Sequence, residues 1–360
     1  MTHTTTDYDT VIAGAGPAGV MAALRAARRG RVLLVDSVKL PREKSCGGML
    51  NKHAQQFLSA FGELPDDMIL GPSHVNFRYW DWDRDIRKPT QLKFLNVDRH
   101  AFDEWLTSLL PDNVDMIGST KIQEFAEDPQ GVIATLKNGD APECVSCRTL
   151  IGADGARSTI RRSLGVGSVA TYVTLQDFVE LKGELEPYFD CIYIRDIGDS
   201  HAYSYVVPKG NVAIVGSVFH PHTKRPYEKQ EKALEILRTR LPQLGERTRR
   251  EACVALCVRS ATDIVPGRGR VLLAGEAGGF MSPTSGEGIS YAMNSGLRAG
   301  DAVASSTPDD ALAYYTRTSA GISANIRRKL RWLPFMESRV GKYLAGYVPA
   351  PIVSRVTEGL

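Results

Sequence analysis

Three short glycine-containing segments combine the residue types that hold a phosphate-bearing dinucleotide. In the first, Gly14 permits a tight turn, Gly16 lets the backbone approach a pyrophosphate, and Gly19 lets a helix pack closely on a strand. Asp36 follows at the spacing at which a carboxylate can accept a hydrogen bond from an adenosine ribose. The residues that we expect to contact the dinucleotide in this part of the chain are Gly14, Gly16, Pro17, Ala18, Gly19, Asp36 and Ser37.

The other two segments indicate that the dinucleotide is FAD. Each follows a strand-like run and precedes a helix, so each can supply backbone contacts to one end of a long dinucleotide threaded between two halves of a fold. Glu276 can accept hydrogen bonds from sugar-chain hydroxyls, and the N–H groups of 286–289 can stabilise negative charge on a reduced isoalloxazine. The expected contacts are Asp154, Gly275, Glu276, Gly286, Gly288 and Ile289.

The elements that must position these loops begin with a βαβ unit. The short β-branched run 8–13 predicts a buried strand, 18–29 is rich in Ala, Leu and Arg and predicts a helix, and 31–35 predicts a second strand. A βαβ unit implies a parallel sheet. Further along, 99–110 and 288–304 predict helices that follow strand-like segments.

The middle of the chain has a different pattern, because 168–262 alternate polar and apolar residues in several β segments around one helix near 226–240. We therefore expect an α/β fold, with a Rossmann-like FAD-binding domain and an inserted antiparallel β-rich substrate domain, followed by a helical C-terminus. The predicted FAD-binding domain comprises 1–75, 97–167 and 263–330, the substrate domain 76–96 and 168–262, and the C-terminal cap 331–360.

Five stretches carry a resemblance to the geranylgeranyl reductase family, which covers essentially the whole chain. They are the first glycine loop, 41–48, 97–103, the Asp154-Gly155 motif and 275–289. The family lies within the flavoprotein superfamily of p-hydroxybenzoate hydroxylase, and the branch that the chain resembles most is that of the bacterial CbrA-like flavoproteins. The resemblance implies FAD binding by the residues above and by Arg99. Glu276 stands where the superfamily usually has Asp, which is a conservative departure.

Cys46 is the residue that the resemblance implies for catalysis. In the reductases that the chain resembles, a cysteine in the setting Pro-x-x-x-x-Cys-Gly-Gly lies beside the flavin, and here Gly47 and Gly48 would let the backbone pass close to the ring. Cys46 would then face the substrate and donate a proton to a carbanion-like centre. The alternative is that Cys46 is a small buried residue that fills space.

Residues 203–218 resemble the substrate strands of the family, with Tyr-x-Trp-x-Phe-Pro followed by Gly-x-Gly. Tyr205 replaces the Trp, Val207 the Phe and Val218 the second Gly. These departures bear on the identity of the substrate more than on the fold. Aromatic residues here could form one wall of an apolar pocket over the flavin, although an ordinary β-hairpin would have the same pattern. The candidate pocket residues are Tyr203, Tyr205, Pro208 and Gly216.

The C-terminal segment 321–360 is basic and aromatic. It combines Arg327, Arg328, Lys329, Arg331, Arg339, Lys342 and Arg355 with Trp332, Phe335, Tyr343 and Tyr347. Such a segment can lie on an anionic membrane surface, or it can be a helical cap with a solvated basic face. The cap is the interpretation that we favour.

Composition excludes several other classes. The net charge of +3 is too small to indicate a nucleic-acid partner. The cysteines do not have the density of a disulfide framework, which favours a cytoplasmic protein. Cys144 and Cys147 have the C-x-x-C spacing of a metal or redox pair, and Cys253 and Cys257 could supply a second pair. We favour ordinary cysteines without a metal, because Cys147 lies in a predicted strand that runs into a turn and the second pair has the spacing of neither a zinc ribbon nor a zinc finger. No apolar run reaches the length of about 18 residues that spans a bilayer.

Three reactions fit these motifs. The first is reduction of carbon–carbon double bonds in a lipophilic, isoprenoid-like substrate by hydride from flavin N5. The alternatives are monooxygenation of a small organic substrate, and a flavoprotein that serves a protein partner. Gly279 stands where hydroxylases more often carry His, which favours the reductase. Because no second Gly-x-Gly-x-x-Gly unit is visible, we expect NAD(P)H or a reduced protein carrier to reduce the flavin transiently.

Overall fold

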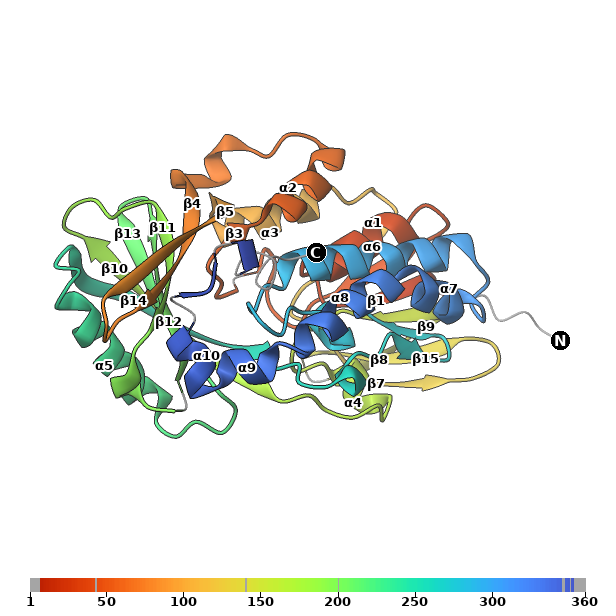
Figure 1. Ribbon diagram of the computed structural model, residues 1–360. Coiled ribbons are helices and arrows are strands. Elements are labelled where there is room, and N and C mark those ends of the chain that lie inside the picture. The colour runs from red at the N-terminus through yellow and green to blue at the C-terminus, as the bar shows by residue number, and fades with distance from the viewer. Residues whose placement is uncertain are drawn as a thin grey trace.

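The computed structural model describes residues 7–42, 44–139, 141–199, 201–344, 347–349 and 351–352. Glu43, the side chain of Arg339, and 353–360 with Arg355 belong to segments considered above but lie outside the described residues. Two eight-stranded sheets stand side by side, and most of the helices surround the first of them (Figure 1). The C-terminal helices run across the front of the gap between the two sheets in this view.

The helices are α1 (Pro17–Ala26), α2 (Lys52–Leu58), α3 (Arg99–Ser108), α4 (Thr159–Ser163), α5 (Pro226–Arg238), α6 (Ile289–Ser305), α7 (Ala311–Thr318), α8 (Ala320–Leu330), α9 (Leu333–Glu337) and α10 (Arg339–Leu344). The strands are β1 (Tyr8–Ala13), β2 (Val32–Val35), β3 (Met49–Leu50), β4 (Ile69–Asp81), β5 (Ile86–Val97), β6 (Val114–Ile117), β7 (Lys121–Glu127), β8 (Val132–Asn138), β9 (Ala141–Gly152), β10 (Thr171–Leu181), β11 (Tyr188–Tyr193), β12 (His201–Lys209), β13 (Val212–Phe219), β14 (Leu244–Leu256), β15 (Gly267–Arg268) and β16 (Val271–Leu273).

The first sheet has the order β15-β16-β9-β1-β2-β6, and a β7–β8 pair extends it at β9. The strands from β16 to β6 are parallel, as the predicted βαβ unit requires. All three glycine segments follow parallel strands of this sheet, because Gly14 comes after β1, Asp154 after β9 and Gly275 after β16. The carboxyl ends of parallel strands meet at one edge, so the fold brings the three segments together. The predicted α/β fold with a Rossmann-like FAD-binding domain is confirmed.

The second sheet has the order β14-β10-β13-β12-β11-β4-β5-β3. It is antiparallel except for β4 and β11, which pair in parallel. The predicted boundary between 75 and 76 lies inside β4, which pairs with β5 from Ile69 to Asp81. The short strand β3, from a segment that we assigned to the FAD-binding domain, also joins this sheet. The reason is that β4 and β5 pair with each other within this sheet along most of their length, and β3 pairs with the end of β5 at Leu95 and Asn96.

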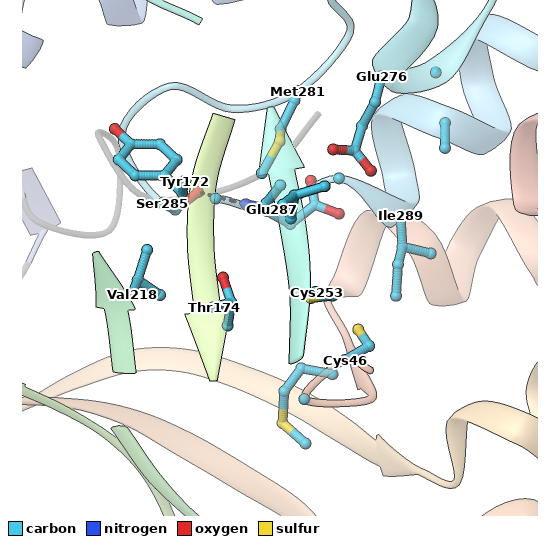
Figure 2. Close-up of a pocket in the computed structure, with 18 of the residues that line it drawn as sticks. Cys46, Tyr172, Thr174, Val218, Cys253, Glu276, Met281, Ser285, Glu287 and Ile289 are labelled. Carbon is cyan, nitrogen blue, oxygen red and sulfur yellow. Dashed lines mark hydrogen bonds between the residues drawn. The ribbon is translucent and has the colours of Figure 1, made fainter. Parts of the chain in front are cut away.

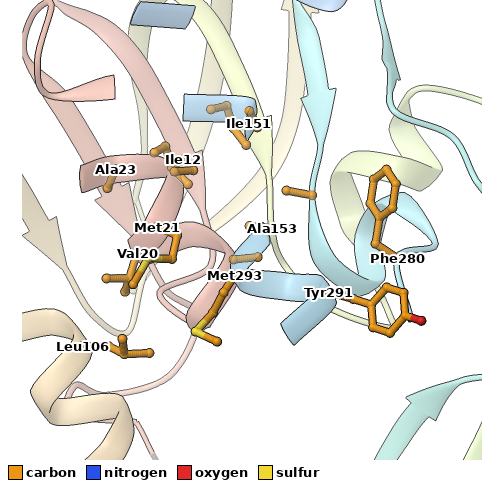
Figure 3. Close-up of a cluster of buried hydrophobic side chains, with 14 of the residues drawn as sticks. Ile12, Val20, Met21, Ala23, Leu106, Ile151, Ala153, Phe280, Tyr291 and Met293 are labelled. Atoms are coloured by element: carbon orange, nitrogen blue, oxygen red, sulfur yellow. The ribbon is translucent and has the colours of Figure 1, made fainter. Parts of the chain in front are cut away.

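Two glycines bring α1 and α6 into close contact beneath the site. A Cβ atom at Gly296 would lie 2.0 Å from the carbonyl oxygen of Ala18, and one at Gly300 would lie 2.3 Å from that of Ala22. Larger residues would force the helices apart. The surrounding core includes Ile12, Val20, Met21, Ile151, Tyr291 and Met293, all fully buried (Figure 3). The N-termini of both helices are thereby held against the same cavity.

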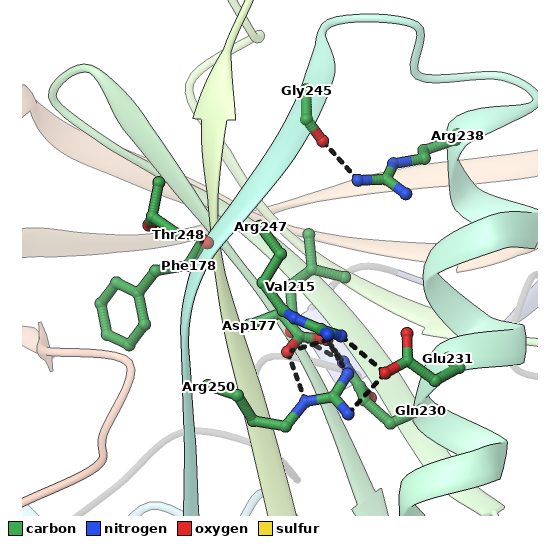
Figure 4. A network of polar contacts seen from close by, with 10 residues as sticks. All are labelled: Asp177, Phe178, Val215, Gln230, Glu231, Arg238, Gly245, Arg247, Thr248 and Arg250. Atoms are coloured by element: carbon green, nitrogen blue, oxygen red, sulfur yellow. Dashed lines mark hydrogen bonds and ion pairs between the residues drawn. The ribbon is translucent and has the colours of Figure 1, made fainter.

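A buried ionic network fixes α5 to the second sheet (Figure 4). The fully buried carboxylate of Asp177 accepts hydrogen bonds from Arg250 Nε at 2.6 Å and Arg250 Nη2 at 2.8 Å, and from Gln230 Nε2 at 2.9 Å. Glu231 on α5 accepts from Arg247 at 2.6 Å and Arg250 at 2.7 Å. Because α5 covers one face of the sheet, the other face is left to line the site.

Candidate FAD and substrate site

One cavity of about 1210 Å³ joins the three glycine segments to the second sheet and the C-terminal helices. Its lining contains most of the predicted cofactor residues, namely Gly14, Gly16, Pro17, Ala18, Asp36, Ser37, Cys46, Gly47, Gly48, Arg99, Asp154, Gly275, Glu276, Gly286, Gly288 and Ile289. Its volume exceeds the range of about 300–1,000 Å³ that is usual for one drug-sized ligand. The cavity therefore has room for a dinucleotide and a second molecule.

The first glycine loop has the geometry that its spacing predicts. Gly14 has a positive φ of 100°, which disfavours a side chain. A Cβ at Gly19 would lie 1.7 Å from the carbonyl oxygen of Gly14, so Gly19 allows the close approach of helix to loop and does not itself line the cavity. The N-terminus of α1, at Gly16, has no side-chain cap. Its N–H groups and helix dipole can therefore bind a phosphate.

Asp36 shapes this loop as well as bordering the cavity. Its carboxylate accepts hydrogen bonds from the N–H groups of Ala15 at 2.7 Å and Val38 at 3.1 Å. Arg42 Nη1 lies 3.5 Å from Asp36 Oδ2 and 2.6 Å from where a Cβ of Gly16 would be. Arg42 is thus a cation beside the expected pyrophosphate position, which the sequence reasoning missed because only the motif around Cys46 drew attention to 41–48.

The second glycine segment owes its shape to Asp154. Its carboxylate accepts from Ser158 Oγ at 2.5 Å and from the N–H groups of Thr159 at 2.6 Å and Ile160 at 3.2 Å. Burial raises the pKa of Asp154, and these hydrogen bonds oppose that shift. Asp154 lines the cavity, but the described contacts of its carboxylate are to the start of α4, so its role here is to hold the loop.

In the third segment, Glu276 joins distant parts of the chain. Its side chain is one of those drawn around the cavity in Figure 2. Its Oε1 accepts from Lys44 Nζ at 3.0 Å and its Oε2 from the N–H of Leu256 at 2.8 Å. Glu276 lines the cavity where a sugar chain was expected, and the hydroxyl contact itself stays a prediction. Gly286 has a positive φ of 68°. Gly288 precedes α6 and lines the cavity, but the Glu287 carboxylate accepts from the N–H of Ser290 at 2.8 Å, so a carboxylate already binds the start of this helix.

The loop at Cys46 is held by cations. The Cys46 sulfur accepts from the N–H of Gly48 at 3.5 Å. Burial raises the pKa of the thiol, but the Arg99 charge, the Gly48 N–H and Lys44 outweigh it, and the pKa lies below its ordinary value. Arg99 is buried and forms a bidentate pair with Asp103, at 2.9 and 3.1 Å. The thiol is therefore more acidic than a free cysteine.

Buried Lys209 supports the same loop from β12. Its Nζ donates to the carbonyl oxygens of Gly48 at 3.2 Å and Val97 at 2.9 Å. Gly48 has a positive φ of 62°, and a Cβ there would lie 2.2 Å from the Val97 carbonyl oxygen. The sequence reasoning missed Lys209, although it follows the Tyr203 and Tyr205 alternation on the same strand.

Two of the four predicted substrate-pocket residues lie in the cavity wall, and their contact with a substrate stays a prediction. Tyr203 and Tyr205 line the cavity, where Tyr205 stacks on Phe189 with ring centroids 5.3 Å apart. Pro208 and Gly216 do not line it. Pro208 lies at an even position of β12, and successive residues of a strand face opposite sides of the sheet. Gly216 instead makes room for the Tyr205 ring, since its Cβ would lie 2.2 Å from that ring.

The C-terminal segment closes the cavity opposite the second sheet. Its contributions are Trp332, Leu333, Phe335, Met336, Glu337, Gly341, Lys342, Val348 and Ile352. Glu337 forms a bidentate ion pair with Arg259, at 2.8 and 2.9 Å, and Tyr79 Oη donates to the Lys342 carbonyl oxygen at 2.9 Å. The described part of 331–352 thus packs as a cap. No local pattern in the sequence indicated that this segment forms part of the cavity wall.

Comparison with known proteins agrees with this geometry. The chain is 29% identical over 335 residues to Protein CbrA from Escherichia coli O9:H4 (strain HS), which covers 90% of this chain and 88% of that protein. In fold it is similar to a geranylgeranyl bacteriochlorophyll reductase-like protein from Thermoplasma acidophilum, with a TM-score of 0.78, 19% identity, and coverage of 98% of this chain and 92% of that one. A flavin-dependent brominase gives a TM-score of 0.77 at 18% identity, with coverage of 97% and 93%.

The uncapped N-terminus of α1 at Gly16, and a loop whose glycines leave no room for a Cβ, fit FAD. The family model described as the FAD binding domain matches residues 112–317, which is more than half of the chain. The chain therefore belongs to the FAD-binding domain family and is an FAD-dependent flavoprotein of the oxidoreductase and monooxygenase-type superfamily.

Proposed function

We propose that this protein reduces carbon–carbon double bonds of a lipophilic, isoprenoid-like substrate. The observation that carries the proposal is the single cavity that runs from the glycine loops, past Cys46, to an aromatic wall. That wall contains Phe77, Tyr79, Phe94, Phe189, Tyr203 and Tyr205. A long apolar chain gains free energy by leaving water for such a surface, at about 25 cal/mol per Å².

Bound FAD, once reduced, supplies a hydride, and the second substrate carbon then needs a proton. Cys46 is the group that we assign to this proton transfer, because its sulfur lies in the cavity wall between the cofactor loops and the aromatic wall. The Gly48 N–H and the Arg99 charge stabilise the thiolate that remains after transfer. Lys209 holds the Gly48 carbonyl and keeps the loop in place.

The reductant is proposed to be NAD(P)H or a reduced protein carrier that visits the flavin transiently. This follows from the sequence, in which only one dinucleotide unit of the Gly-x-Gly-x-x-Gly type is visible.

Monooxygenation is the second candidate function. It is favoured by the fold similarity to the brominase and to a tetracycline destructase, the latter with a TM-score of 0.67 at 18% identity. In that case reduced flavin would react with oxygen, and the aromatic wall would hold a compact organic molecule instead of a prenyl chain.

Anaerobic turnover separates the two. The purified holoprotein is reduced with dithionite, mixed with a geranylgeranyl lipid without oxygen, and the lipid is analysed by mass spectrometry. The proposal predicts a gain of two hydrogens for each reduced double bond. Product that forms only after oxygen is admitted, with an added oxygen atom, would refute it and support the second function.

Two cysteine variants test the assigned proton donor. Cys46→Ser should keep FAD but lower turnover roughly a hundredfold or more, the range of general acid catalysis. Cys144→Ser is the matched control, because Cys144 is exposed on β9 and does not line the cavity. Equal turnover of the wild type and Cys46→Ser would remove Cys46 from the mechanism.

A further inference from the structure

Exposed apolar side chains gather on the C-terminal segment. Within the described residues, those between 332 and 352 form what we call the C-terminal apolar patch, which consists of Trp332, Phe335, Val340, Tyr343, Leu344, Tyr347 and Ile352. Val340 is 62% exposed and Tyr347 is 59% exposed. Elsewhere, exposed large apolar side chains are scattered, which is normal for a protein surface. The patch is therefore an unusual concentration.

The patch and the cavity share residues. Trp332, Phe335 and Ile352 are exposed to solvent and also line the cavity. These three side chains thus form an exposed apolar rim of the cavity, and the other members of the patch lie outside its lining. A lipophilic molecule that entered at this rim would move from one apolar environment to another.

Cations flank the patch at the end of α8. Arg327, Arg328 and Arg331 are exposed and directly precede Trp332, and α8 packs against α9. Lys329 points inward instead, with its Nζ 3.3 Å from Ser282 Oγ. Exposed arginines beside aromatic and aliphatic side chains match a surface that is anionic at its headgroups and apolar beneath them.

We propose that the C-terminal apolar patch docks on the surface of an anionic lipid bilayer, and that the lipophilic substrate enters the cavity there. Substrate entry rests on the proposed function, whereas docking itself does not. The binding is peripheral, since none of the helices in the described part of the chain has the length and hydropathy needed to cross a bilayer. The aromatic and aliphatic side chains contribute to the free energy of binding by inserting among the lipids, and the three arginines contribute by electrostatic attraction to the anionic headgroups.

A second copy of the chain fits this surface less well. In a symmetric dimer the same surface of both copies is brought together, so both sets of arginines lie at one interface. Like charges at an interface are repulsive. An anionic bilayer instead neutralises them.

Vesicle flotation tests docking without any assay of turnover. The full-length holoprotein is mixed with vesicles of phosphatidylcholine alone or with phosphatidylglycerol added. We expect binding to the anionic vesicles that weakens as salt rises. The triple variant Arg327→Gln, Arg328→Gln, Arg331→Gln should lose at least about tenfold in partitioning, and Val340→Ser with Leu344→Ser, neither of which lines the cavity, should lose several-fold.

Matched variants elsewhere on the surface act as controls. Lys137→Gln, Lys182→Gln and Lys224→Gln remove three exposed cations, and Ile133→Ser with Tyr227→Ser removes two exposed apolar side chains. Both sets should bind vesicles like the wild type, and circular dichroism confirms that each variant is folded. Docking is overturned if the wild type does not float with anionic vesicles, if the control sets lose as much binding as the patch variants, or if the patch mediates only a homodimer or a protein complex.

Activity in detergent is measured separately on a geranylgeranyl lipid. Vesicle binding without reduction of the lipid would refute the proposed function and leave docking standing. Reduction of the lipid without vesicle binding would refute docking alone.

Discussion

Replacing Lys209 with methionine removes a buried ammonium that holds the loop beside the expected flavin position. The lysine is 5% exposed, and its Nζ donates to the carbonyl oxygens of Gly48 and Val97. Burial lowers the pKa of Lys209 from 10.5 to about 7, although Cys46 and Asp98 act in the opposite direction. Methionine keeps a similar volume and removes the titrating group.

The sign of the pH dependence follows from this shift. Between about pH 7 and 10.5 the unfolded chain keeps Lys209 protonated while the folded chain does not, so unfolding takes up a proton. The contribution of Lys209 to stability is therefore fully present above pH 10.5 and is lost as the pH falls through about 7. The limiting slope is about 1.4 kcal/mol per pH unit. From about pH 7 to about pH 9, the wild type should gain roughly 2–3 kcal/mol relative to Lys209→Met.

Denaturant unfolding at a series of pH values measures this difference. Groups that do not interact with Lys209 titrate alike in both proteins and cancel when the two curves are subtracted, so the difference reports Lys209 together with its interactions with Cys46 and Asp98. Lys182→Met is the control, because Lys182 is exposed and its removal should leave the slope unchanged. Parallel curves for the wild type and Lys209→Met would show that Lys209 titrates alike in both states, and the reasoning about its burial would then be wrong.

Three further substitutions test how the loops and the cap are held. Gly19→Ala should cost about 3 kcal/mol or more and reduce bound FAD, because the new Cβ would lie 1.7 Å from a backbone oxygen; normal stability and FAD content would contradict this. Asp154→Ala should cost about 1–2 kcal/mol, measured by urea unfolding, because it removes the hydrogen bonds to Ser158 and to the first N–H groups of α4, with Asp154→Asn intermediate. Glu337→Gln should change global stability by less than about 1 kcal/mol but speed proteolysis of the C-terminal segment several-fold, because its partner Arg259 is largely exposed; unchanged cleavage would show that the ion pair does not hold the cap.

Local signals in the sequence were sufficient to predict the cofactor half of the fold. The strand at Tyr8–Ala13 was predicted with its observed bounds, and the expected helices at 18–29, 99–110 and 288–304 correspond to α1, α3 and α6. These predictions succeed because glycine spacing and apolar periodicity report backbone conformation directly. Strand alternation would also have excluded Pro208 from the pocket, because it lies on the opposite face of β12 from Tyr203 and Tyr205.

The rest depends on contacts between residues far apart in the chain. Lys44 meets Glu276 and Lys209 meets Gly48, pairs separated by 232 and 161 residues, and no local pattern encodes either contact. The same holds for the domain boundary inside β4 and for the C-terminal segment, whose basic and aromatic composition fits a cap and a membrane surface alike. The sequence by itself indicated a dinucleotide-binding fold and the positions of its three glycine loops, because those loops are local structures. Only the tertiary structure decided which side chains surround Cys46 and close the cavity, because that depends on how two sheets and the C-terminal helices pack against one another.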